Sequence, residues 1–256
     1  MSHSRRPLAV VLAVITLALL LSAGGERRAS AADPVRVLVL GDSISATEVW
    51  QQELGRLLDV GGVPREIHTV AAAGASCWQL AGQTRYALET YQPDLVVIEC
   101  GTNDDPSDSV YGESRTGWSF RVMVEAVHQF RPTQPIPIVP TLIQYSDPSN
   151  APRWLWESNE PRTNDVLWTN MRYYRPPATS APWFAGIADL QRIPSNATYL
   201  DGTGIHPTPA GHRIIGRIVY DEAAARMGWP ASGEPPPCGL DGHRPGTAPP
   251  SVARCP

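Results

Sequence analysis

The sequence predicts an α/β domain with a central parallel sheet and helices on both faces. Two observations predict this fold class. Short runs of aliphatic and β-branched residues alternate with segments of helical periodicity, and residues 94–100 are apolar almost throughout. A strand of that composition is covered on both faces, which is typical of parallel sheets. We therefore expect the ligand site in the loops at the carboxyl ends of the strands.

Four strands are expected, and their bounds follow from where the aliphatic runs begin and end. They lie at residues 35–40, 66–71, 94–100 and 136–143. Pro137 and Pro140 predict that the fourth strand is irregular or lies at an edge, because proline cannot donate a hydrogen bond to a strand ladder.

Helices are expected between and after these strands. The first follows residue 45, with Ser45 and Glu48 as a capping box and an apolar face that begins at Trp50. Others are expected at residues 79–91, 117–131 and 165–174. Thr208 as N-cap and Pro209 at the first helical position predict a terminal helix.

The first 31 residues have the composition of a signal peptide. Arg5 and Arg6 precede an apolar run over residues 8–21, and residues 29–31 fit an A-x-A cleavage site. The run is shorter than the roughly 20 residues of a membrane-spanning helix, and an uncleaved anchor is the alternative. The sequence thus predicts a signal peptide at 1–31, one domain at 32–227, a Pro/Gly-rich tail at 228–256, and a secreted or cell-envelope location.

The net charge limits the classes of binding partner. It is −4, and the charged residues that signal cleavage would remove are mostly arginine, so the mature chain would be more acidic still. Binding to nucleic acid or to an anionic membrane is therefore not expected.

The four cysteines of an exported chain favour disulfides, with three pairings open. Cys238 and Cys255 both lie in the tail and are expected to pair, which leaves Cys77 with Cys100. None has metal-site spacing.

Four residues in strand-to-helix loops could carry chemistry. Ser43, in Gly41-Asp42-Ser43, would be exposed where the first strand ends, close to helix N–H groups. Gly74 lets the backbone approach a ligand, and Asn103 could donate its amide to an oxyanion. His206 could take a proton from serine and return it to a leaving group. Alone, each also fits a plain turn or helix cap.

In combination and in this order, Gly41-Asp42-Ser43, Gly74, Gly101-Thr102-Asn103-Asp104 and Gly204-Ile205-His206-Pro207 resemble the SGNH/GDSL hydrolase family of secreted, lipase- and esterase-like enzymes. The resemblance covers residues 35–226. It implies a three-layer α/β/α, flavodoxin-like fold in which an acyl ester is cleaved without a metal or organic cofactor. It also implies Ser43 as nucleophile, His206 as base, and an oxyanion hole formed by Ser43, Gly74 and Asn103. Cys77 and Cys100 would then lie beside two adjacent loops of that hole.

One position departs from the family pattern. The family has an aspartate three residues before the histidine, where this chain has Thr203, and the nearest acid is Asp201. Three interpretations are open: a bulged loop brings Asp201 to the histidine as the third catalytic residue, a backbone carbonyl orients the ring, or the site is weak or inactive. His212, on the last helix, is expected to be structural or a helix-surface residue.

The function predicted from the sequence is hydrolysis of a small-molecule, glycan or lipid ester through an acyl-Ser43 intermediate by a monomer. Two alternatives stay open. The same site could serve a cell-envelope glycan O-acyltransferase or deacetylase, or, given Thr203, the domain could be a non-catalytic glycan- or lipid-binding module. The aromatic- and proline-rich stretch 146–197 could line a sugar or acyl pocket, or form a lid packed on the core.

Overall fold

The computed structural model describes residues 33–173 and 183–233. The predicted signal peptide and the tail cysteines Cys238 and Cys255 lie outside the described residues. A five-stranded sheet has the order β2-β1-β3-β6-β7, and every neighbouring pair is parallel. Its strands are β1 (Val35–Gly41), β2 (Arg65–Ala71), β3 (Leu95–Glu99), β6 (Ile138–Leu142) and β7 (Ala188–Asp189).

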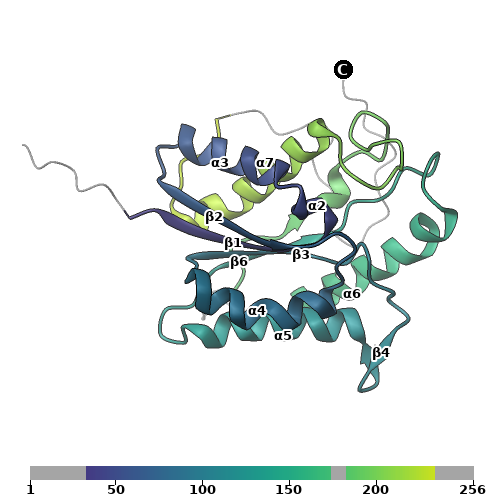
Figure 1. Cartoon of the computed structure of the whole chain (residues 1–256), viewed down its shortest axis with the longest axis horizontal. Coiled ribbons are helices and arrows are strands. Elements are labelled where there is room, and N and C mark those ends of the chain that lie inside the picture. The colour runs from purple at the N-terminus through teal and green to yellow at the C-terminus, as the bar shows by residue number, and fades with distance from the viewer. Residues whose placement is uncertain (1–32, 174–182, 234–256) are drawn as a thin grey trace, which may run out of the picture. The chain divides into compact units, whose positions relative to one another are not determined.

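Helices cover both faces of this sheet (Figure 1). One layer holds α3 (Val49–Val60) and α7 (Pro209–Met227), and the other holds α4 (Cys77–Tyr91) and α5 (Arg115–Phe130). The remaining elements are α2 (Ser43–Ala46), the hairpin β4 (Ser109–Val110) and β5 (Glu113–Ser114), a π-helix (Leu155–Asn159), α6 (Glu160–Tyr173) and a 3-10 turn (Leu190–Arg192). The predicted three-layer α/β/α class is confirmed.

Alternate residues of β1 explain why the sheet is buried on both sides. Val37 and Val39 belong to the core under α3 and α7, whereas Leu38 and Leu40 belong to the core under α4 and α5. All four side chains are fully buried. Because successive strand residues point to opposite faces, an uninterrupted aliphatic strand supplies both cores at once.

One of the two alternatives for the fourth strand is wrong, and so is the predicted capping box. The fourth strand, β6, is not an edge, because it lies between β3 and the two-residue strand β7. Ser45 and Glu48 do not form a capping box. The Ser45 hydroxyl donates to Glu99 at 2.8 Å, and the helix begins only after Glu48. The Ser45 hydroxyl is thus bonded to the buried Glu99 and does not cap the helix as the local sequence pattern had predicted.

The end of the domain follows its sequence signals closely. The Thr208 hydroxyl accepts a hydrogen bond from the Gly211 N–H, and Pro209 is the first residue of α7, as predicted. Among the described residues, none of the helices combines the length and the apolar character needed to cross a bilayer.

Candidate active site

Ser43 lies where β1 stops. Asp42 caps the short helix α2, its carboxylate accepting from the Ile44 N–H at 2.9 Å, so the chain turns sharply away from the sheet at Ser43. Gly41 must be glycine here, because an added Cβ would stand 2.3 Å from the Ser45 Cβ. The Ser43 side chain is left partly exposed at the carboxyl edge of the sheet.

His206 reaches this edge on a tight loop, residues 200–207, which we call the histidine loop. Leu200 and Pro207 form an antiparallel bridge at its base, and the Asp201 N–H donates to the His206 carbonyl at 2.8 Å. The imidazole Nε2 then stands 3.1 Å from the Ser43 Oγ. Residues 163 positions apart in the chain are thus brought to hydrogen-bond distance, as the sequence analysis expected of a nucleophile and its base.

The other imidazole nitrogen faces Thr203 rather than a carboxylate. Nδ1 of His206 lies 3.5 Å from the Thr203 Oγ1. That hydroxyl in turn hydrogen-bonds the Asp201 carboxylate, which also accepts the Thr203 N–H at 2.9 Å. Although partial burial raises the pKa of Asp201, these two bonds and the nearby His206 hold it below its ordinary value. The bulged loop therefore connects Asp201 to His206 through a threonine hydroxyl.

Two further loops flank Ser43. The glycine loop, residues 72–76, follows β2, and Gly74 sits in it with φ of +76°, a conformation that L-residues rarely adopt. The asparagine loop, residues 100–104, follows β3. Its exposed Asn103 donates to the Ala75 carbonyl at 3.1 Å, which holds the two loops side by side. The second amide hydrogen of Asn103 is not used by that bond.

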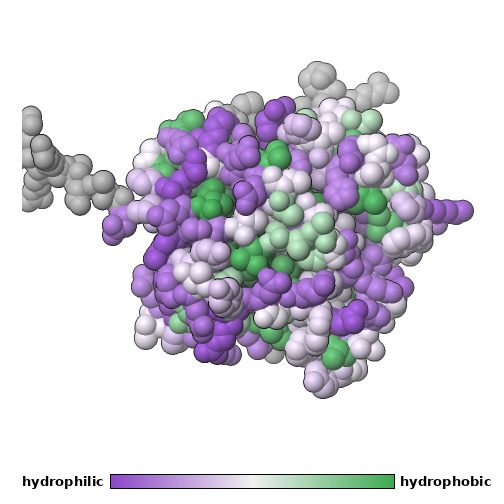
Figure 2. All heavy atoms as spheres, viewed as in Figure 1, coloured by the Kyte–Doolittle hydropathy of each residue, from purple (hydrophilic) through white to green (hydrophobic). Residues whose placement is uncertain are grey.

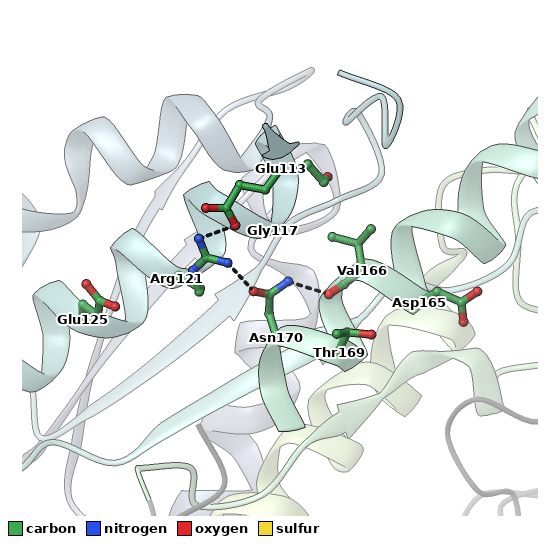
Figure 3. Close-up of a pocket in the computed structure, with 9 residues that line it drawn as sticks. Glu113, Gly117, Arg121, Glu125, Asp165, Val166, Thr169 and Asn170 are labelled. Carbon is green, nitrogen blue, oxygen red and sulfur yellow. Dashed lines mark hydrogen bonds and ion pairs between the residues drawn. The ribbon is translucent and has the colours of Figure 1, made fainter. Parts of the chain in front are cut away.

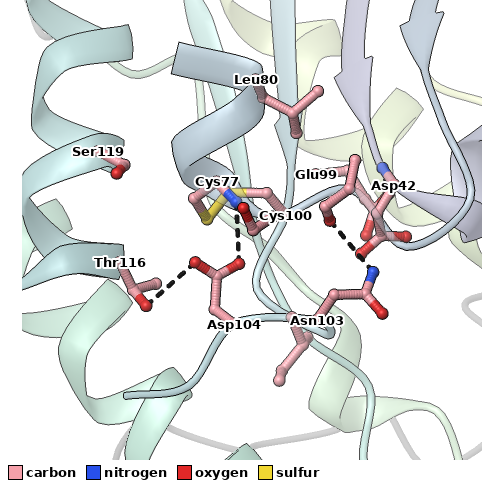
Figure 4. Close-up of a disulfide and its surroundings, with 12 residues drawn as sticks. Asp42, Cys77, Leu80, Glu99, Cys100, Asn103, Asp104, Thr116 and Ser119 are labelled. Carbon is pink, nitrogen blue, oxygen red and sulfur yellow. Dashed lines mark hydrogen bonds between the residues drawn. A yellow bond between two sulfur atoms is a disulfide. The ribbon is translucent and has the colours of Figure 1, made fainter. Parts of the chain in front are cut away.

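Two buried interactions tie these loops together more firmly (Figure 4). A disulfide joins Cys77 to Cys100, the pairing expected from the sequence. Beside it, the Asp104 carboxylate accepts from the Cys77 N–H at 2.9 Å and from the Thr116 hydroxyl at 3.2 Å. Burial raises the pKa of Asp104, and the two hydrogen bonds oppose that shift. Asp104 thus holds the first residues of α4 and α5 to the asparagine loop.

A pair of carboxyl groups is buried beneath the nucleophile. Glu99 accepts from the Asp42 N–H at 3.2 Å and from the Ser45 hydroxyl. Burial raises the pKa of Asp42 to about 6, and burial together with the Asp42 charge raises that of Glu99 well above its usual range. Two buried carboxyl groups this close repel each other when both are ionised, so the folded state is most stable when one of them carries a proton.

His212 is buried on α7, so the expectation of a helix-surface residue is wrong and the structural interpretation stands. Burial, and then the positive charge of a protonated His206, lower its pKa to about 4. A neutral His212 adds no repulsion to the imidazolium that would form on His206 during proton transfer.

The surface around Ser43 is open and weakly apolar. Ala46, Ala72, Ala73 and Gly74 are all exposed. Figure 2 shows small apolar residues gathered over the centre of the viewed face, where α2 and the ends of β2 and β3 lie in Figure 1, with hydrophilic residues around them. Within the described ranges, three or more His, Cys, Asp or Glu side chains are nowhere grouped so as to hold a metal ion.

A separate cavity of about 720 Å³ lies between α5 and α6, away from Ser43 (Figure 3). Arg121, one of its lining residues, lies between Glu113 and Asn170. It forms an ion pair with Glu113 and donates to the Asn170 amide oxygen at 3.2 Å. The lining residues are Glu113, Ser114, Gly117, Arg121, Glu125, Asp165, Val166, Thr169 and Asn170. Of its acidic groups, Glu113 is thus paired with a cation of the same lining.

The aromatic-rich stretch 146–197 is described in part, because residues 174–182 lie outside the described residues. Trp168, Trp183 and Phe184 pack against the core under α5, whereas Trp154 is exposed. The stretch also supports the histidine loop, since the Asp147 N–H donates to the Gly204 carbonyl at 2.7 Å.

A parallel sheet between helices, with a serine and a histidine paired at its carboxyl edge, defines a class of ester hydrolases. The family model of the GDSL-like lipase/acylhydrolase family matches residues 39–214, and the chain belongs to that family. It is therefore an ester-hydrolysing enzyme of the GDSL/SGNH type, as the motifs predicted.

Solved structures share the fold at low sequence identity. A lipase/acylhydrolase from Enterococcus faecalis aligns with a TM-score of 0.58 at 18% identity over 77% of this chain and 98% of its own. A family 3 carbohydrate esterase from Clostridium thermocellum aligns with a TM-score of 0.59 at 15% identity, covering 76% and 97%. An acetyl xylan esterase aligns with a TM-score of 0.52 at 16% identity, covering 73% and 98%. No curated protein matches the chain significantly in sequence.

The structure brings Ser43 and His206 to hydrogen-bond distance and holds Asn103 against the glycine loop, and sequence reasoning missed the groups that support these loops. Glu99 was visible as an acid at the end of a strand otherwise made of aliphatic residues, and Asp104 as an acid in the loop that follows it. A lone acid in such a strand is a usable sign of a buried polar network. Thr203 was noted as a loss, whereas the structure places its hydroxyl between histidine and carboxylate.

Proposed function

We propose that this protein is an exported serine esterase that cleaves carboxylic esters through an acyl-Ser43 intermediate. The observation that carries the proposal is the 3.1 Å approach of the Ser43 Oγ to the His206 Nε2 at the carboxyl edge of the sheet. Export is supported by the signal-like residues 1–31 and by the Cys77–Cys100 disulfide, since disulfides persist in oxidising compartments.

The chemistry follows from which atoms face each other. His206 takes the Ser43 hydroxyl proton on Nε2 as Oγ attacks the ester carbonyl carbon. The negative oxygen that results is stabilised by the backbone N–H groups of Ser43 and Gly74 and by the Asn103 amide. His206 then protonates the departing alcohol, leaving Ser43 acylated. A water molecule then attacks the acyl carbon and gives its proton to His206, and His206 returns that proton to the Ser43 Oγ as the carbon–Oγ bond breaks and the acid leaves.

In this mechanism Asp201 acts on the histidine through Thr203. Nδ1–H of His206 donates to the Thr203 Oγ1, whose own proton is donated to the Asp201 carboxylate. A hydroxyl that donates to a carboxylate is a better acceptor, because a chain of hydrogen bonds polarises its members. The relay fixes the tautomer that leaves Nε2 free to accept the serine proton.

The test is replacement of the nucleophile. Ser43→Ala should abolish hydrolysis of p-nitrophenyl acetate and labelling by a fluorophosphonate probe, while far-ultraviolet circular dichroism stays that of the parent. Ser158→Ala, which removes an exposed serine hydroxyl elsewhere, is the matched control and should retain both activities. Turnover by Ser43→Ala at the parent rate would refute the assignment. A parent protein that is neither labelled nor active would favour the binding module.

A further inference from the structure

Three aromatic side chains form a surface cluster that the ester chemistry above does not use. Trp78 is 45% exposed and Tyr111 is 85% exposed. The ring centroids of Trp78 and Trp118 lie 5.4 Å apart, and those of Tyr111 and Trp118 lie 6.0 Å apart. We call Trp78, Trp118 and Tyr111 the aromatic platform. A contiguous set of large rings left in water marks an interaction site more often than single exposed residues do.

The platform is attached to the loops of the candidate active site. Trp78 is the second residue of α4, separated from the glycine loop by Cys77 alone, and Trp118 lies in the first turn of α5. Asp104, next to Asn103, is hydrogen-bonded to the starts of both helices, through the Cys77 N–H and the Thr116 hydroxyl (Figure 4). The same loop that presents the Asn103 amide therefore fixes the two tryptophans beside it.

Tyr111 is presented in an unusual backbone conformation. It shares the two-residue turn of the β4–β5 hairpin with Gly112, and their φ angles are +53° and +81°. Positive φ at both positions is normally met by Asn, Asp or Gly, and it strains a bulky side chain. Such strain is retained mainly where a side chain has a function.

Two ion pairs brace this hairpin against α5. Arg115, at the start of the helix, pairs with Asp108, and Arg121, one turn beyond Trp118, pairs with Glu113 (Figure 3). Salt bridges of this kind stabilise little by themselves, but two of them restrict how the hairpin tip moves. Tyr111 is thus held over Trp118 on a braced support.

We propose that the aromatic platform binds the sugar rings of an O-acylated neutral glycan whose ester is cleaved at Ser43, an inference that rests on the proposed function. The C–H groups on one face of a pyranose meet the negative face of an aromatic ring, and the indole N–H and the phenol O–H at the ring edges can bond to sugar hydroxyls. The rings are tilted by 32° and 49°, so they form an open, curved surface that a chain of sugar rings can follow.

Other ligand classes fit the platform less well. Single-stranded nucleic acid also stacks on aromatic rings but needs a basic groove, and this chain has a net charge of −4. A lipid surface also accepts Trp and Tyr at its interface, but its acyl chains pack against aliphatic side chains, and of the exposed large hydrophobic residues in the described part of the chain, Val60, Trp78, Tyr86, Tyr111 and Trp154, one alone is aliphatic. A cage for an ammonium group needs rings that face one another from several sides, which the small tilts do not provide.

The experiment compares a glycan ester with a small ester in the full-length mature protein. The substrates are partially O-acetylated xylan, partially O-acetylated glucomannan, a tributyrin emulsion and p-nitrophenyl acetate. The variants are Trp78→Ala and Tyr111→Ala, with Tyr86→Ala as the matched control, since Tyr86 is a 73% exposed tyrosine on the same helix α4 but outside the cluster. Thermal unfolding checks that each variant is folded.

We expect the ratio of kcat/KM for an acetylated glycan to kcat/KM for p-nitrophenyl acetate to fall about tenfold in either platform variant, as one or two lost ring contacts predict. Tyr86→Ala should leave that ratio unchanged. The proposal is overturned if the ratio stays at the parent value in folded platform variants, or if only tributyrin hydrolysis falls, which would point to a lipid.

Binding without turnover separates this proposal from the function on which it rests. In gels containing deacetylated xylan or glucomannan, the Ser43→Ala protein should migrate more slowly than in plain gels, and Trp78→Ala added to it should restore the migration. Retardation by neither glycan would overturn the platform even in an active esterase. Retardation of a parent protein that has no esterase activity would support the platform and reject the proposed function.

Discussion

Two parts of the site support its chemistry by different means. The glycine and asparagine loops are joined by a disulfide, by the buried Asp104 carboxylate and by the bond from Asn103 to Ala75. The histidine loop is partly exposed and carries its orienting group, Thr203, on the surface. Donors aimed at an oxyanion must be fixed before the reaction, because reorganising them during it costs barrier height. The contact that would orient the imidazole is longer and more exposed than the bonds that hold the donors.

The largest effect should come from removing a fixed donor. Asn103→Ala is expected to lower kcat for p-nitrophenyl acetate about 10²- to 10³-fold, which is roughly 3–4 kcal/mol of transition-state stabilisation. Stopped-flow or steady-state kinetics of the purified variant measure it. Asn103→Asp, which keeps the shape but donates no proton, is the matched comparison and should be at least as slow. A kcat within threefold of the parent would show that the Asn103 amide does not contact the oxyanion.

The covalent tie should matter next. Replacing Cys77 and Cys100 together by alanine is expected to lower the free energy of unfolding by about 3 kcal/mol. The two cysteines are 23 residues apart in the chain, and without the disulfide the unfolded chain between them gains conformational entropy. Urea denaturation gives the value. A reductant should reproduce the loss in the parent protein and have no further effect on the double variant. Equal stability of parent and variant would mean that Asp104 alone suffices to hold the loops.

The buried acids beneath Ser43 predict a pH-dependent stability. Their folded-state pKa values are raised, to about 6 for Asp42 and well above the usual range for Glu99. Well below pH 4 both groups are protonated in either state and their burial costs no ionisation energy. As the pH rises from about 4 towards 6, the unfolded state releases protons that the folded state retains, so stability falls, and the loss due to Asp42 levels off once the pH passes its folded-state pKa of about 6. Glu99→Gln keeps an acceptor oxygen and removes the charge.

The measurement is the difference in unfolding free energy between Glu99→Gln and the parent, followed from pH 4.5 to 8. It should shift by about 2 kcal/mol in favour of the variant. Glu89→Gln, at an exposed position of α4, should show no such trend. A difference that is flat across this range would mean that the two acids do not share a buried proton.

How far the sequence could predict this site depends on the range of the interactions. Ser43, Gly74 and Asn103 follow strands, and strand ends in a parallel sheet converge whatever the helices do, so their meeting was predictable. The cap at Thr208 is likewise local. The loss of the Ser45 cap was not, because it depends on Glu99, which is 54 residues away in the chain. Whether the Asp201 carboxylate would contact the His206 imidazole directly depended on the backbone path of a loop that contains two glycines. The hydrophobic periodicity of the sequence does not predict such a path.

The smallest predicted effect tests the histidine loop itself. Thr203→Val keeps the shape and removes the hydroxyl between His206 and Asp201. We expect kcat/KM to fall roughly fivefold, the effect of losing one neutral hydrogen bond of about 1 kcal/mol, and Thr203→Ser to restore most of the activity.

A double-mutant cycle decides whether Asp201 acts through that hydroxyl. If it does, Asp201→Asn slows the parent severalfold but has little further effect in Thr203→Val, since the path between carboxylate and ring is already broken. Effects that simply multiply would mean that the Asp201 charge reaches His206 through space. The relay interpretation would then be wrong, while the roles proposed for Ser43 and Asn103 would stand, because Ser43 contacts Nε2 of His206 and Asn103 contacts Ala75, and neither contact involves Thr203 or Asp201.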